Sequence, residues 1–483
     1  MGNQINKTDL NVYTINANGD NTYSNVSNIL KPLHYKKIWV GNCQTFALDY
    51  KNNLYSFGLN DYFQLGNLTK TNYLFNSNNN KNNNNVKTKK TIFNTFKCLN
   101  KIFPIPTTKI SKISTGDGFS LFLTKEGKVY SLGKNNKYQL GYEISNKESE
   151  IINGIKCLKK PNEIEYFSKN NIFIVNIFSG SDFSFAKDEK GIFYSWGNNE
   201  HNQLAKKNNT KKYEIYPSKA DLIPENQTIQ NLVCGWMHCA FLNYKGEVFL
   251  WGNLLYDYDK NIKDIIEPYK LNLKGKAIEI SSGFFHIGII CNVIDKYELY
   301  TFGGNDFGQL GYDIKNKNIN YDIINNDNNI SNNNFNDNKN NFSNDNFNHN
   351  IINHYFNKYN FNENKIYSEI PLKVEFNNKK CSVLHISCGA FHTICLLDDN
   401  SVYGFGNNEY REVGLYQSDI INYPSIVNWI DKDDNKVIQN ILCGNGFTYI
   451  LKVNKENFDL KKKEENANIL FSEMFSEKDS IKK

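Results

Sequence analysis

The feature that most constrains this chain is an internal repeat marked by pairs of glycines. Seven segments begin with a small residue followed by Gly and then by a strand-like run. Six of these segments carry a second Gly, which follows an aromatic or apolar residue. The offset between the two glycines is 17 residues in five repeats and 20 in one. A spacing this regular indicates a repeat protein. The first and second glycines are Gly41, Gly116, Gly180, Gly235, Gly283, Gly389 and Gly444, and Gly58, Gly133, Gly197, Gly252, Gly303 and Gly406.

Each interval between the two glycines predicts a β-hairpin. Residues 119–123 and 129–132, for example, are two short β-forming runs separated by the polar turn Lys125-Glu126-Gly127. A Gly- and Asn-rich turn then follows the second Gly and ends in Gln-Leu-Gly, as in residues 59–66 and 304–311. Because Gly and Asn tolerate positive φ at little cost, we interpret the repeat glycines as architectural.

Small sheets repeated at this spacing predict an all-β fold, a seven-bladed β-propeller over residues 1–460. The seventh unit has Gly444 but lacks a second Gly, whereas residues 12–19 near the N-terminus resemble the missing half. We therefore expect strands from the two ends of the chain to complete one blade and close the ring.

The repeats are separated by Asn-rich stretches at about 70–95 and 313–366. These stretches lack the apolar residues needed to offset the entropy of ordering, so we predict disordered insertions. The mixed-charge residues 461–483 form a C-terminal tail, which we expect to dock on the propeller rather than on a partner.

Charge and composition exclude several classes of protein. A net charge of +6 over 483 residues gives no field for binding a polyanion. The N-terminus lacks the apolar core of a signal peptide, and no apolar run approaches the length of about 18 residues that spans a bilayer. Ten cysteines without a Cys-x-x-Cys pair fit a reducing compartment. We expect an intracellular, soluble monomer, in the nucleus or the cytoplasm.

The glycine pairs, the 17-residue step and the Asn-x-x-x-Gln-Leu-Gly turn resemble the regulator of chromosome condensation repeat, over nearly the whole chain. The resemblance implies the same seven-bladed propeller. Propellers of this family act as exchange factors for Ran-type GTPases, as ubiquitin-ligase modules or as scaffolds, so the fold alone does not choose a function.

The turn that follows each first glycine holds the candidate partner-binding residues. It is acidic in two successive repeats and aromatic in later ones, which predicts an acidic sector beside an aromatic sector on one face. The alternative is that each aromatic side chain only covers the neighbouring blade. The candidates are Asp117, Asp182, Trp236, Met237, Phe284, Phe285 and Phe391.

The resemblance gives the two acids a specific role. In the Ran exchange factor, acidic residues in this turn of two successive repeats contribute to nucleotide exchange, and Asp117 and Asp182 match those positions. Two departures weaken the match. The turn at 133–141 lacks the extra wedge of the exchange factor, and the turn that begins at Gly252 lacks both the Gln-Leu-Gly ending and a histidine.

The other reactive side chains have structural interpretations. Cys234, Cys388 and Cys443 occupy a slot held elsewhere by Ser or Thr, and His238, His286 and His392 recur three residues after the first Gly, at positions that a ring keeps apart. We expect these histidines to hydrogen-bond or stack, and only His201 to form an exposed contact.

No phosphate-binding loop, metal-binding helix or nucleophile elbow is present in the sequence. We therefore expect no enzyme, metal or cofactor. Two hypotheses remain open: a regulator of a Ran-type small GTPase with exchange activity, and a protein-interaction scaffold without it. Neither hypothesis includes chromatin contact through a basic tail, because the chain has none.

Overall fold

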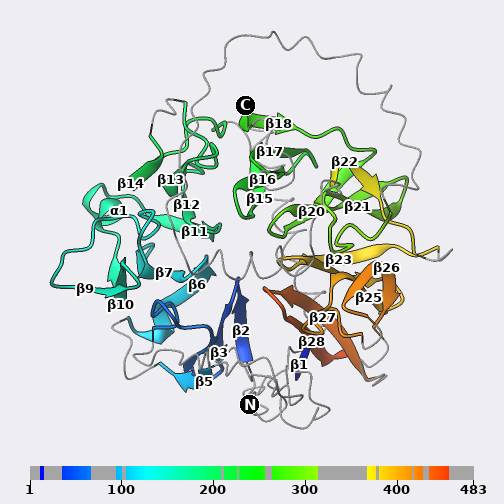
Figure 1. The fold of residues 1–483 in the computed structure, drawn as a ribbon, viewed down its shortest axis with the longest axis horizontal. Coiled ribbons are helices and arrows are strands. Elements are labelled where there is room, and N and C mark those ends of the chain that lie inside the picture. Colours follow the sequence, from blue (N-terminus) through cyan, green and yellow to red (C-terminus); the bar gives the residue numbers. More distant parts are fainter. Residues whose placement is uncertain are drawn as a thin grey trace, which may run out of the picture.

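The computed structural model describes residues 11–15, 35–66, 94–99, 105–207, 211–225, 228–255, 264–313, 367–376, 380–415, 418–427 and 435–455. Within these ranges the chain is almost entirely β-structure, with the 3-10 helix η1 (Thr107–Lys109) and the short helix α1 (Glu165–Lys169) as the helical elements. Figure 1 shows the sheets arranged in a ring, with β2, β6, β11, β15, β23 and β27 nearest its centre. The prediction of an all-β propeller is confirmed.

The described strands form seven sheets, which we number in chain order. Sheet 1 contains β2 (Tyr35–Val40), β3 (Gln44–Asp49), β4 (Leu54–Gly58) and β5 (Asn94–Cys98). Sheet 2 contains β6 (Ile110–Thr115), β7 (Phe119–Thr124), β8 (Val129–Lys134), β10 (Ile155–Glu163) and β9 (Ser149–Ile152). Sheet 3 contains β11 (Ile174–Ser179), β12 (Phe183–Asp188), β13 (Phe193–Asn198) and β14 (Tyr213–Lys219). Sheet 4 contains β15 (Ile229–Cys234), β16 (His238–Asn243), β17 (Val248–Gly252) and β18 (Ile265–Lys270).

The remaining three sheets use the C-terminal half of the chain and one N-terminal strand. Sheet 5 contains β19 (Lys276–Ser282), β20 (His286–Val293), β21 (Lys296–Gly304) and β22 (Tyr367–Lys373). Sheet 6 contains β23 (Val383–Cys388), β24 (His392–Leu397), β25 (Val402–Asn407) and β26 (Ile420–Ile426). Sheet 7 contains β27 (Lys436–Cys443), β28 (Thr448–Asn454) and β1 (Asn11–Ile15).

In six sheets the glycine pair brackets the hairpin formed by the second and third strands, as the sequence predicts. The first Gly follows the innermost strand, and in six repeats the second Gly lies at or near the end of the third strand. At Gly133, φ is +105°, and a Cβ added there would lie 2.4 Å from the carbonyl oxygen of Gly118. Any other residue at this position would meet both backbone strain and a clash, so the spacing of the second glycines follows from hairpin geometry.

The hydrophobic core lies between consecutive sheets rather than within one central cluster. Phe46 of sheet 1 packs edge-on against Phe122 of sheet 2 with ring centroids 5.4 Å apart, and Phe185 of sheet 3 packs against Trp251 of sheet 4 at 6.2 Å. All four side chains are fully buried. Each sheet therefore buries its apolar faces only by standing next to its neighbours, which is the physical basis of a propeller.

A polar contact also joins consecutive sheets at the Gln-Leu-Gly turns. The residue four positions after a first glycine donates its side-chain hydrogen to the backbone carbonyl oxygen of the Gln, or its equivalent, in the preceding repeat. The hydroxyls of Ser120, Ser184 and Thr393 donate to Gln64, Gln139 and Gln309 at 2.8, 3.0 and 2.9 Å. The turn that begins at Gly252 has neither Gln nor Glu at the equivalent position, and the next repeat holds Ile287, which cannot donate, in the donor slot.

Sheet 7 combines the first described strand, near the N-terminus, with the last two described strands. Strand β1 pairs antiparallel with β28, in a register that sets Asn11 opposite Lys452 and Ile15 opposite Thr448. On its other side β28 pairs with β27. The strand segment expected from the N-terminal sequence therefore lies beside the last hairpin that the structure describes.

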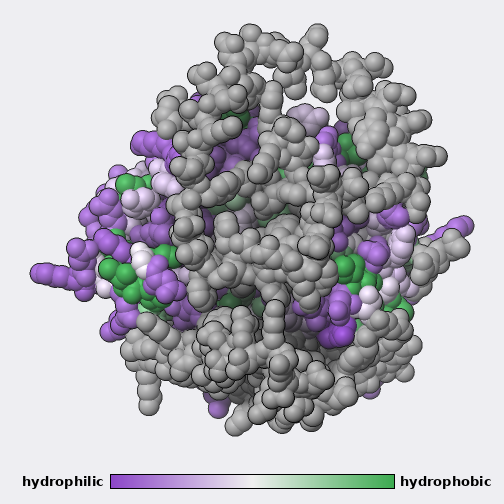
Figure 2. Space-filling model, in the orientation of Figure 1, coloured by the Kyte–Doolittle hydropathy of each residue, from purple (hydrophilic) through white to green (hydrophobic). Residues whose placement is uncertain are grey.

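The Asn-rich insertions and the C-terminal tail lie outside the described residues, apart from positions 94–95, which begin β5, and 313. Within the described ranges, no helix has the length and apolar character needed to cross a membrane. Polar and apolar side chains are interspersed over the described surface of the face shown in Figure 2.

Candidate functional site

The turns that follow the first glycines are joined to one another by backbone hydrogen bonds from sheet to sheet. The N–H of Asp117 donates to the carbonyl oxygen of Ser181 at 2.8 Å, and the N–H of Trp236 donates to that of Phe284 at 3.1 Å. Phe284 in turn donates to Ala390 at 3.1 Å. Residues directly after the first glycines therefore lie side by side at one end of the innermost strands, and we call this set of turns the inner turn ring.

Glycine is required where these turns approach each other. A Cβ added to Gly283 would lie 2.4 Å from the carbonyl oxygen of Gly389, and one added to Gly389 would lie 2.6 Å from that of Gly444. Neither distance is compatible with a side chain. The first glycines thus allow the close backbone contact that sets the spacing of the inner turn ring.

The two predicted acids meet at a lysine. The ammonium of Lys134, the last residue of β8, lies 3.1 Å from Oδ2 of Asp117 and 3.2 Å from Oδ1 of Asp182. The side chains of Lys134, Asp117 and Asp182 are 5%, 11% and 17% exposed. The structure therefore brings the two acids of sheets 2 and 3 together, but as an ion-paired cluster in which Asp182 is the more accessible carboxylate.

The electrostatics of this cluster favour the charged lysine. Burial alone would lower the pKa of Lys134, but the carboxylates of Asp182 and Asp117 raise the pKa above its ordinary value. Two carboxylates and one ammonium leave a net charge of −1 on the cluster. A buried ion pair with several partners is costly to break, because each remaining charge would be left without compensation.

Neighbouring polar groups hold Asp182 in place. The side-chain amide of Gln139, from the Gln-Leu-Gly turn of sheet 2, donates to Oδ1 of Asp182 at 3.1 Å. Next to it, the ammonium of Lys137 contacts the hydroxyl of Tyr213 at 2.9 Å and the carboxylate of Glu200 at 3.3 Å. The acidic sector therefore continues outward over sheet 3 as alternating charges.

The aromatic candidates also gather, in a cluster over sheets 4 to 6. The ring of Phe284 lies 4.8 Å from that of Trp236 and 5.5 Å from that of Phe391, and Phe285 lies 6.0 Å from Phe391. Aromatic contacts at these distances stabilise the turns that carry them.

Burial divides the aromatic cluster into two groups. Phe285 and Phe391 are 0% and 2% exposed and belong to the hydrophobic core between sheets, so their rings are not available to a partner in this structure. This corrects the sequence-based selection of these two residues, which placed core side chains at the surface. Trp236, Met237 and Phe284 are partly exposed and remain candidates for partner contact.

The three repeated histidines have the structural role expected from their positions. The Nε2 atoms of His238, His286 and His392 lie 2.8, 2.9 and 3.0 Å from hydroxyls of the next sheet, those of Ser282, Thr393 and Thr448. Burial lowers the pKa of each histidine to about 3, so the rings are neutral. His201 is different, because its Nδ1 lies 3.2 Å from Oδ1 of Asp264 near the surface.

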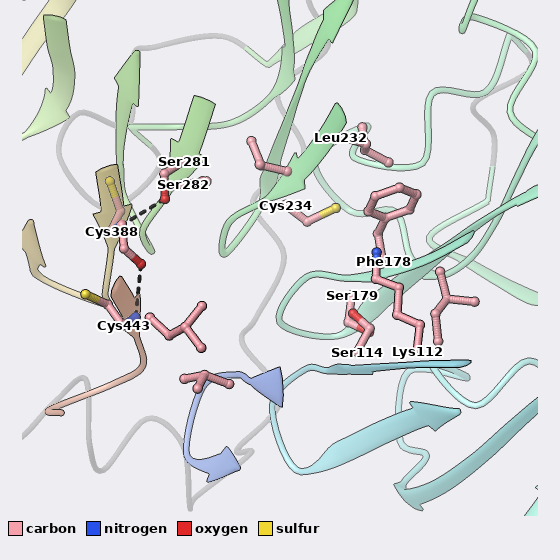
Figure 3. Close-up of a pocket in the computed structure, with 15 residues that line it drawn as sticks. Lys112, Ser114, Phe178, Ser179, Leu232, Cys234, Ser281, Ser282, Cys388 and Cys443 are labelled. Carbon is pink, nitrogen blue, oxygen red and sulfur yellow. Dashed lines mark hydrogen bonds between the residues drawn. The ribbon is translucent and has the colours of Figure 1, made fainter. Parts of the chain in front are cut away.

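A cavity of about 270 Å³ lies at the centre of the ring, and every innermost strand contributes to its wall. Lys112 is the charged residue among those lining it, and its ammonium lies 4.4 Å from the centroid of the Phe178 ring. Figure 3 shows Cys234, Cys388 and Cys443 around this cavity together with serine side chains. Each of the seven innermost strands contributes at least one residue to the wall. In chain order, one from each strand, these are Val40, Lys112, Ser179, Cys234, Ser282, Cys388 and Cys443.

Sequence reasoning missed Lys134, although a signal for it was present. The position after the second glycine holds Leu59, Asn198, Asn253, Gly304 or Asn407 in the other repeats, so Lys134 is the charged exception. Within the part of the chain that the structure describes, no cluster of His, Cys, Asp and Glu has the arrangement of a metal site.

The profile of the regulator of chromosome condensation (RCC1) repeat matches the chain in four segments. One form of the profile matches residues 126–186 and 190–242, and a second form matches residues 110–139 and 383–412. These segments include the turns that carry Asp117, Asp182 and Trp236.

Curated relatives share about a quarter of the aligned residues. The ultraviolet-B receptor UVR8 of Arabidopsis thaliana is 23% identical over 335 residues, which cover 67% of this chain and 59% of the receptor. Guanine nucleotide exchange factor SRM1 of Saccharomyces cerevisiae is 25% identical over 297 residues, which cover 56% of this chain and 57% of that protein. The matches thus span less than two thirds of the length of these relatives.

Solved structures show the same fold. The crystal structure of Prp20p from Saccharomyces cerevisiae, described together with its binding properties to Gsp1p and histones, aligns with a TM-score of 0.62 at 19% identity. The alignment covers 96% of this chain and 95% of Prp20p. Human WBSCR16 aligns with a TM-score of 0.57 at 17% identity over 87% of each chain. Residues 110–186, 190–242 and 383–412 therefore carry regulator of chromosome condensation repeats, and the chain shares the fold of these solved structures.

Proposed function

We propose that this chain is a protein-binding regulatory propeller that acts on a Ran-type small GTPase, with guanine-nucleotide exchange as its activity. The observation that carries the proposal is the cluster of Asp117, Lys134 and Asp182 at the inner turn ring. Carboxylates from two successive sheets converge there on one partly exposed site. The similarity to exchange factor SRM1 supports the same assignment at the level of the family.

The physical basis is electrostatic competition. A small GTPase holds its nucleotide through Mg²⁺ and cationic contacts to the phosphates. A carboxylate presented next to those contacts stabilises the nucleotide-free arrangement, and exchange follows from that differential stabilisation. Asp182 is the residue we assign to this role, because Asp117 is more deeply buried and both carboxylates share Lys134.

A nucleotide-release assay tests the proposal. A Ran-type GTPase loaded with fluorescent GDP is mixed with micromolar full-length protein and excess unlabelled GTP, and release is followed by fluorescence. We expect acceleration by the wild-type protein and at least tenfold less with Asp182→Asn. The matched control is Asp221→Asn, an exposed acid in the turn after β14, which should leave release unchanged. Absence of any acceleration by the wild-type protein would exclude exchange on this class of GTPase.

The second candidate function is a protein-interaction scaffold without exchange activity. The partly exposed Trp236, Met237 and Phe284 favour it, because aromatic and methionine side chains set within a polar surface are typical anchors of protein interfaces. Affinity purification of wild-type protein beside Trp236→Ala and Phe284→Ala variants tests it. We expect a specific partner to be lost with both variants, and retention of every partner would contradict this candidate.

We also infer that the seven sheets are seven blades of one closed ring, with β1 completing sheet 7. The pairing of β1 with β28 supports this closure, as does the contact of the inner turns of sheets 7 and 1, where Asn445 meets Asn42. In this arrangement the acidic and aromatic sectors lie on the same end of the central cavity, where one partner can contact both.

A further inference from the structure

Two free thiols face each other across the first hairpin of sheet 4. Cys234 is the last residue of β15 and Cys239 is the second residue of β16, and the two are direct partners in the antiparallel register. Their sulfur atoms lie 3.6 Å apart. Both cysteines are unbridged.

The pair is specific to this sheet. Every other sheet has the same two slots in the same register, but none of them holds cysteine at both. The equivalent pairs are Val40 and Thr45, Thr115 and Ser120, Ser179 and Ser184, Ser282 and Ile287, Cys388 and Thr393, and Cys443 and Thr448.

The geometry of the strands permits a disulfide. Directly opposed residues in antiparallel strands have Cα atoms about 4.5–5.5 Å apart, which lies within the range of about 4.4–6.8 Å found for disulfides. The sulfurs of Cys234 and Cys239 would have to move from 3.6 Å to a bond length of about 2.05 Å.

Access to the two thiols is unequal. Cys234 is partly exposed and lines the central cavity, as Figure 3 shows, whereas Cys239 is fully buried. Burial raises the pKa of the Cys239 thiol well above its ordinary value, so this thiol stays protonated and unreactive towards solutes. An oxidant that enters the cavity therefore meets Cys234 first, with Cys239 held in contact behind it.

We propose that Cys234 and Cys239 form a redox-modification site that takes a hydroperoxide as its substrate. The thiol of Cys234 reacts with the hydroperoxide to give a sulfenic acid and release an alcohol, or water when the oxidant is hydrogen peroxide. The sulfur of Cys239 then attacks the sulfur of Cys234: the S–S bond forms as the S–O bond of the sulfenic acid breaks, and the hydroxyl leaves as water with the proton of the Cys239 thiol. A dithiol reductant reverses the reaction and is itself oxidised to a disulfide.

The disulfide would close a six-residue loop around the turn that carries Trp236 and Met237. The ring of Trp236 packs at a tilt against that of Phe284, with centroids 4.8 Å apart. The sulfur of Cys239 also contacts the carbonyl oxygen of Gln203, which accepts the indole N–H of Trp251 at 2.9 Å. Moving Cys239 towards Cys234 alters the support of this turn. Oxidation then controls how Trp236 is presented to a partner, a consequence that rests on the proposed function, although the modification itself does not.

Peptide mapping tests the modification directly. Reduced full-length protein is treated with a small molar excess of hydrogen peroxide, denatured, alkylated and digested with trypsin. Both cysteines lie between Lys219 and Lys245, and so in one tryptic peptide. The oxidised product is this peptide lighter by two hydrogens and carrying no alkyl groups. The reduced form carries two alkyl groups. We expect the oxidised peptide to appear before oxidation of the peptides that contain Cys388 or Cys443.

Variants taken from the other repeats keep the fold and isolate the chemistry. Cys239→Thr places the residue found at 393 and 448 and should leave a sulfenic acid on Cys234 that a dimedone probe traps. Cys234→Ser places the residue found at 179 and 282 and should abolish both products. Alkylation of both Cys234 and Cys239 in peroxide-treated wild-type protein would overturn the proposal, as would oxidation of Cys388 or Cys443 at the same rate.

Partner binding provides a separate readout. Reduced and oxidised proteins are compared in the binding assay used for Trp236→Ala. Disulfide formation with unchanged binding would reject the regulatory consequence alone. Absence of the disulfide in a protein that still binds its partner would reject the redox site and leave the proposed function intact.

Discussion

The backbone N–H of Asn445 donates to the carbonyl oxygen of Asn42 at 2.6 Å, and so joins the inner turns of sheets 7 and 1. The same two sheets meet through side chains. The hydroxyl of Thr45 lies 3.5 Å from that of Tyr449, whose ring packs edge-on against Phe57 at 6.1 Å. The last sheet therefore contacts the first in the same way as other sheets contact their sequence neighbours.

Removal of β1 should destabilise the whole propeller. Deletion of residues 1–16 takes away a strand with five register pairs to β28 and leaves that strand as an exposed edge. At a net contribution of about 1 kcal/mol per backbone hydrogen bond, we expect a loss of several kcal/mol in the free energy of unfolding. Urea denaturation measures the loss, and a peptide of residues 9–19 added in excess should restore part of it. An unchanged unfolding midpoint would show that β1 does not close the ring.

Replacement of Lys134 should strongly destabilise the folded protein. Lys134→Met leaves the carboxylates of Asp117 and Asp182 close together without their shared cation, and we expect a loss of about 3–5 kcal/mol. Asp117→Asn in the same background should recover part of this loss, which a double-mutant cycle quantifies. The control Lys128→Met breaks an exposed pair with Glu163 and should have a far smaller effect on stability, because solvent screens this pair. Equal losses for the two lysines would contradict the role of the cluster.

The fold was largely predictable because its main constraint is local. Gly133 needs positive φ and lies against the carbonyl oxygen of Gly118, and the same hairpin geometry recurs at each second glycine. A requirement that acts within about 20 residues leaves a regular trace in the sequence. The hydroxyl donors at Ser120 and Ser184 are also readable from the sequence, because each accompanies a Gln-Leu-Gly turn one repeat earlier.

The site was less predictable, because its contacts cross between sheets. The sequence places Asp117 and Asp182 in equivalent turns, but not the lysine that pairs with both, since Lys134 lies 17 residues from one acid and 48 from the other. Phe284 and Phe285 are adjacent in the sequence, yet only Phe284 is partly exposed. Which of two neighbouring aromatic residues faces the core depends on how the next sheet packs.

Substitution of a first glycine should be far more harmful than substitution of a turn glycine. Gly389→Ala would place a methyl group 2.1 Å from the ring of His392 and 2.6 Å from the carbonyl oxygen of Gly444. We expect a loss above about 3 kcal/mol or failure to fold, since two sheets must move apart. The control Gly191→Ala has open space around its Cβ and should cost only about 1–2 kcal/mol for its positive φ. Thermal denaturation of both variants compares them, and similar melting temperatures would contradict the explanation.

The buried histidines should make the protein sensitive to acid. Burial lowers the pKa of His286 from 6.5 to about 3, so below pH 6.5 the unfolded chain binds a proton that the folded protein does not. Its contribution to stability is complete above pH 6.5 and is lost as the pH falls towards 3, at about 1.4 kcal/mol per pH unit.

His286→Gln should reduce this sensitivity, because glutamine fits the slot. Gln44 occupies the equivalent position in sheet 1 and donates to the carbonyl oxygens of Gly116 and Phe119 at 3.0 and 3.1 Å. Between pH 7 and pH 5, the free energy of unfolding should fall by about 2 kcal/mol less in the variant than in the wild type. Chemical denaturation at the two pH values gives this difference, and parallel losses would show that His286 is not buried as a neutral base.

Glu412 should act in the opposite pH range. It occupies the position of the glutamine in the Gln-Leu-Gly turn, is 1% exposed, and accepts the backbone N–H of Tyr410 at 2.8 Å. Burial raises the pKa of its carboxyl from 4.5 to about 8, so the folded protein keeps a proton that the unfolded chain releases. The stability that Glu412 contributes is therefore complete below pH 4.5 and is lost as the pH rises towards 8.

Glu412→Gln restores the residue of the other turns and cannot ionise, so the variant should exceed the wild type in stability at pH 8 by more than at pH 5. Glu375→Gln, at an exposed position paired with Lys373, provides the control and should show no such trend. Urea denaturation of the three proteins at both pH values measures the effect, and a Glu412→Gln difference that is the same at pH 5 and pH 8 would mean that the carboxyl is ionised in the folded protein.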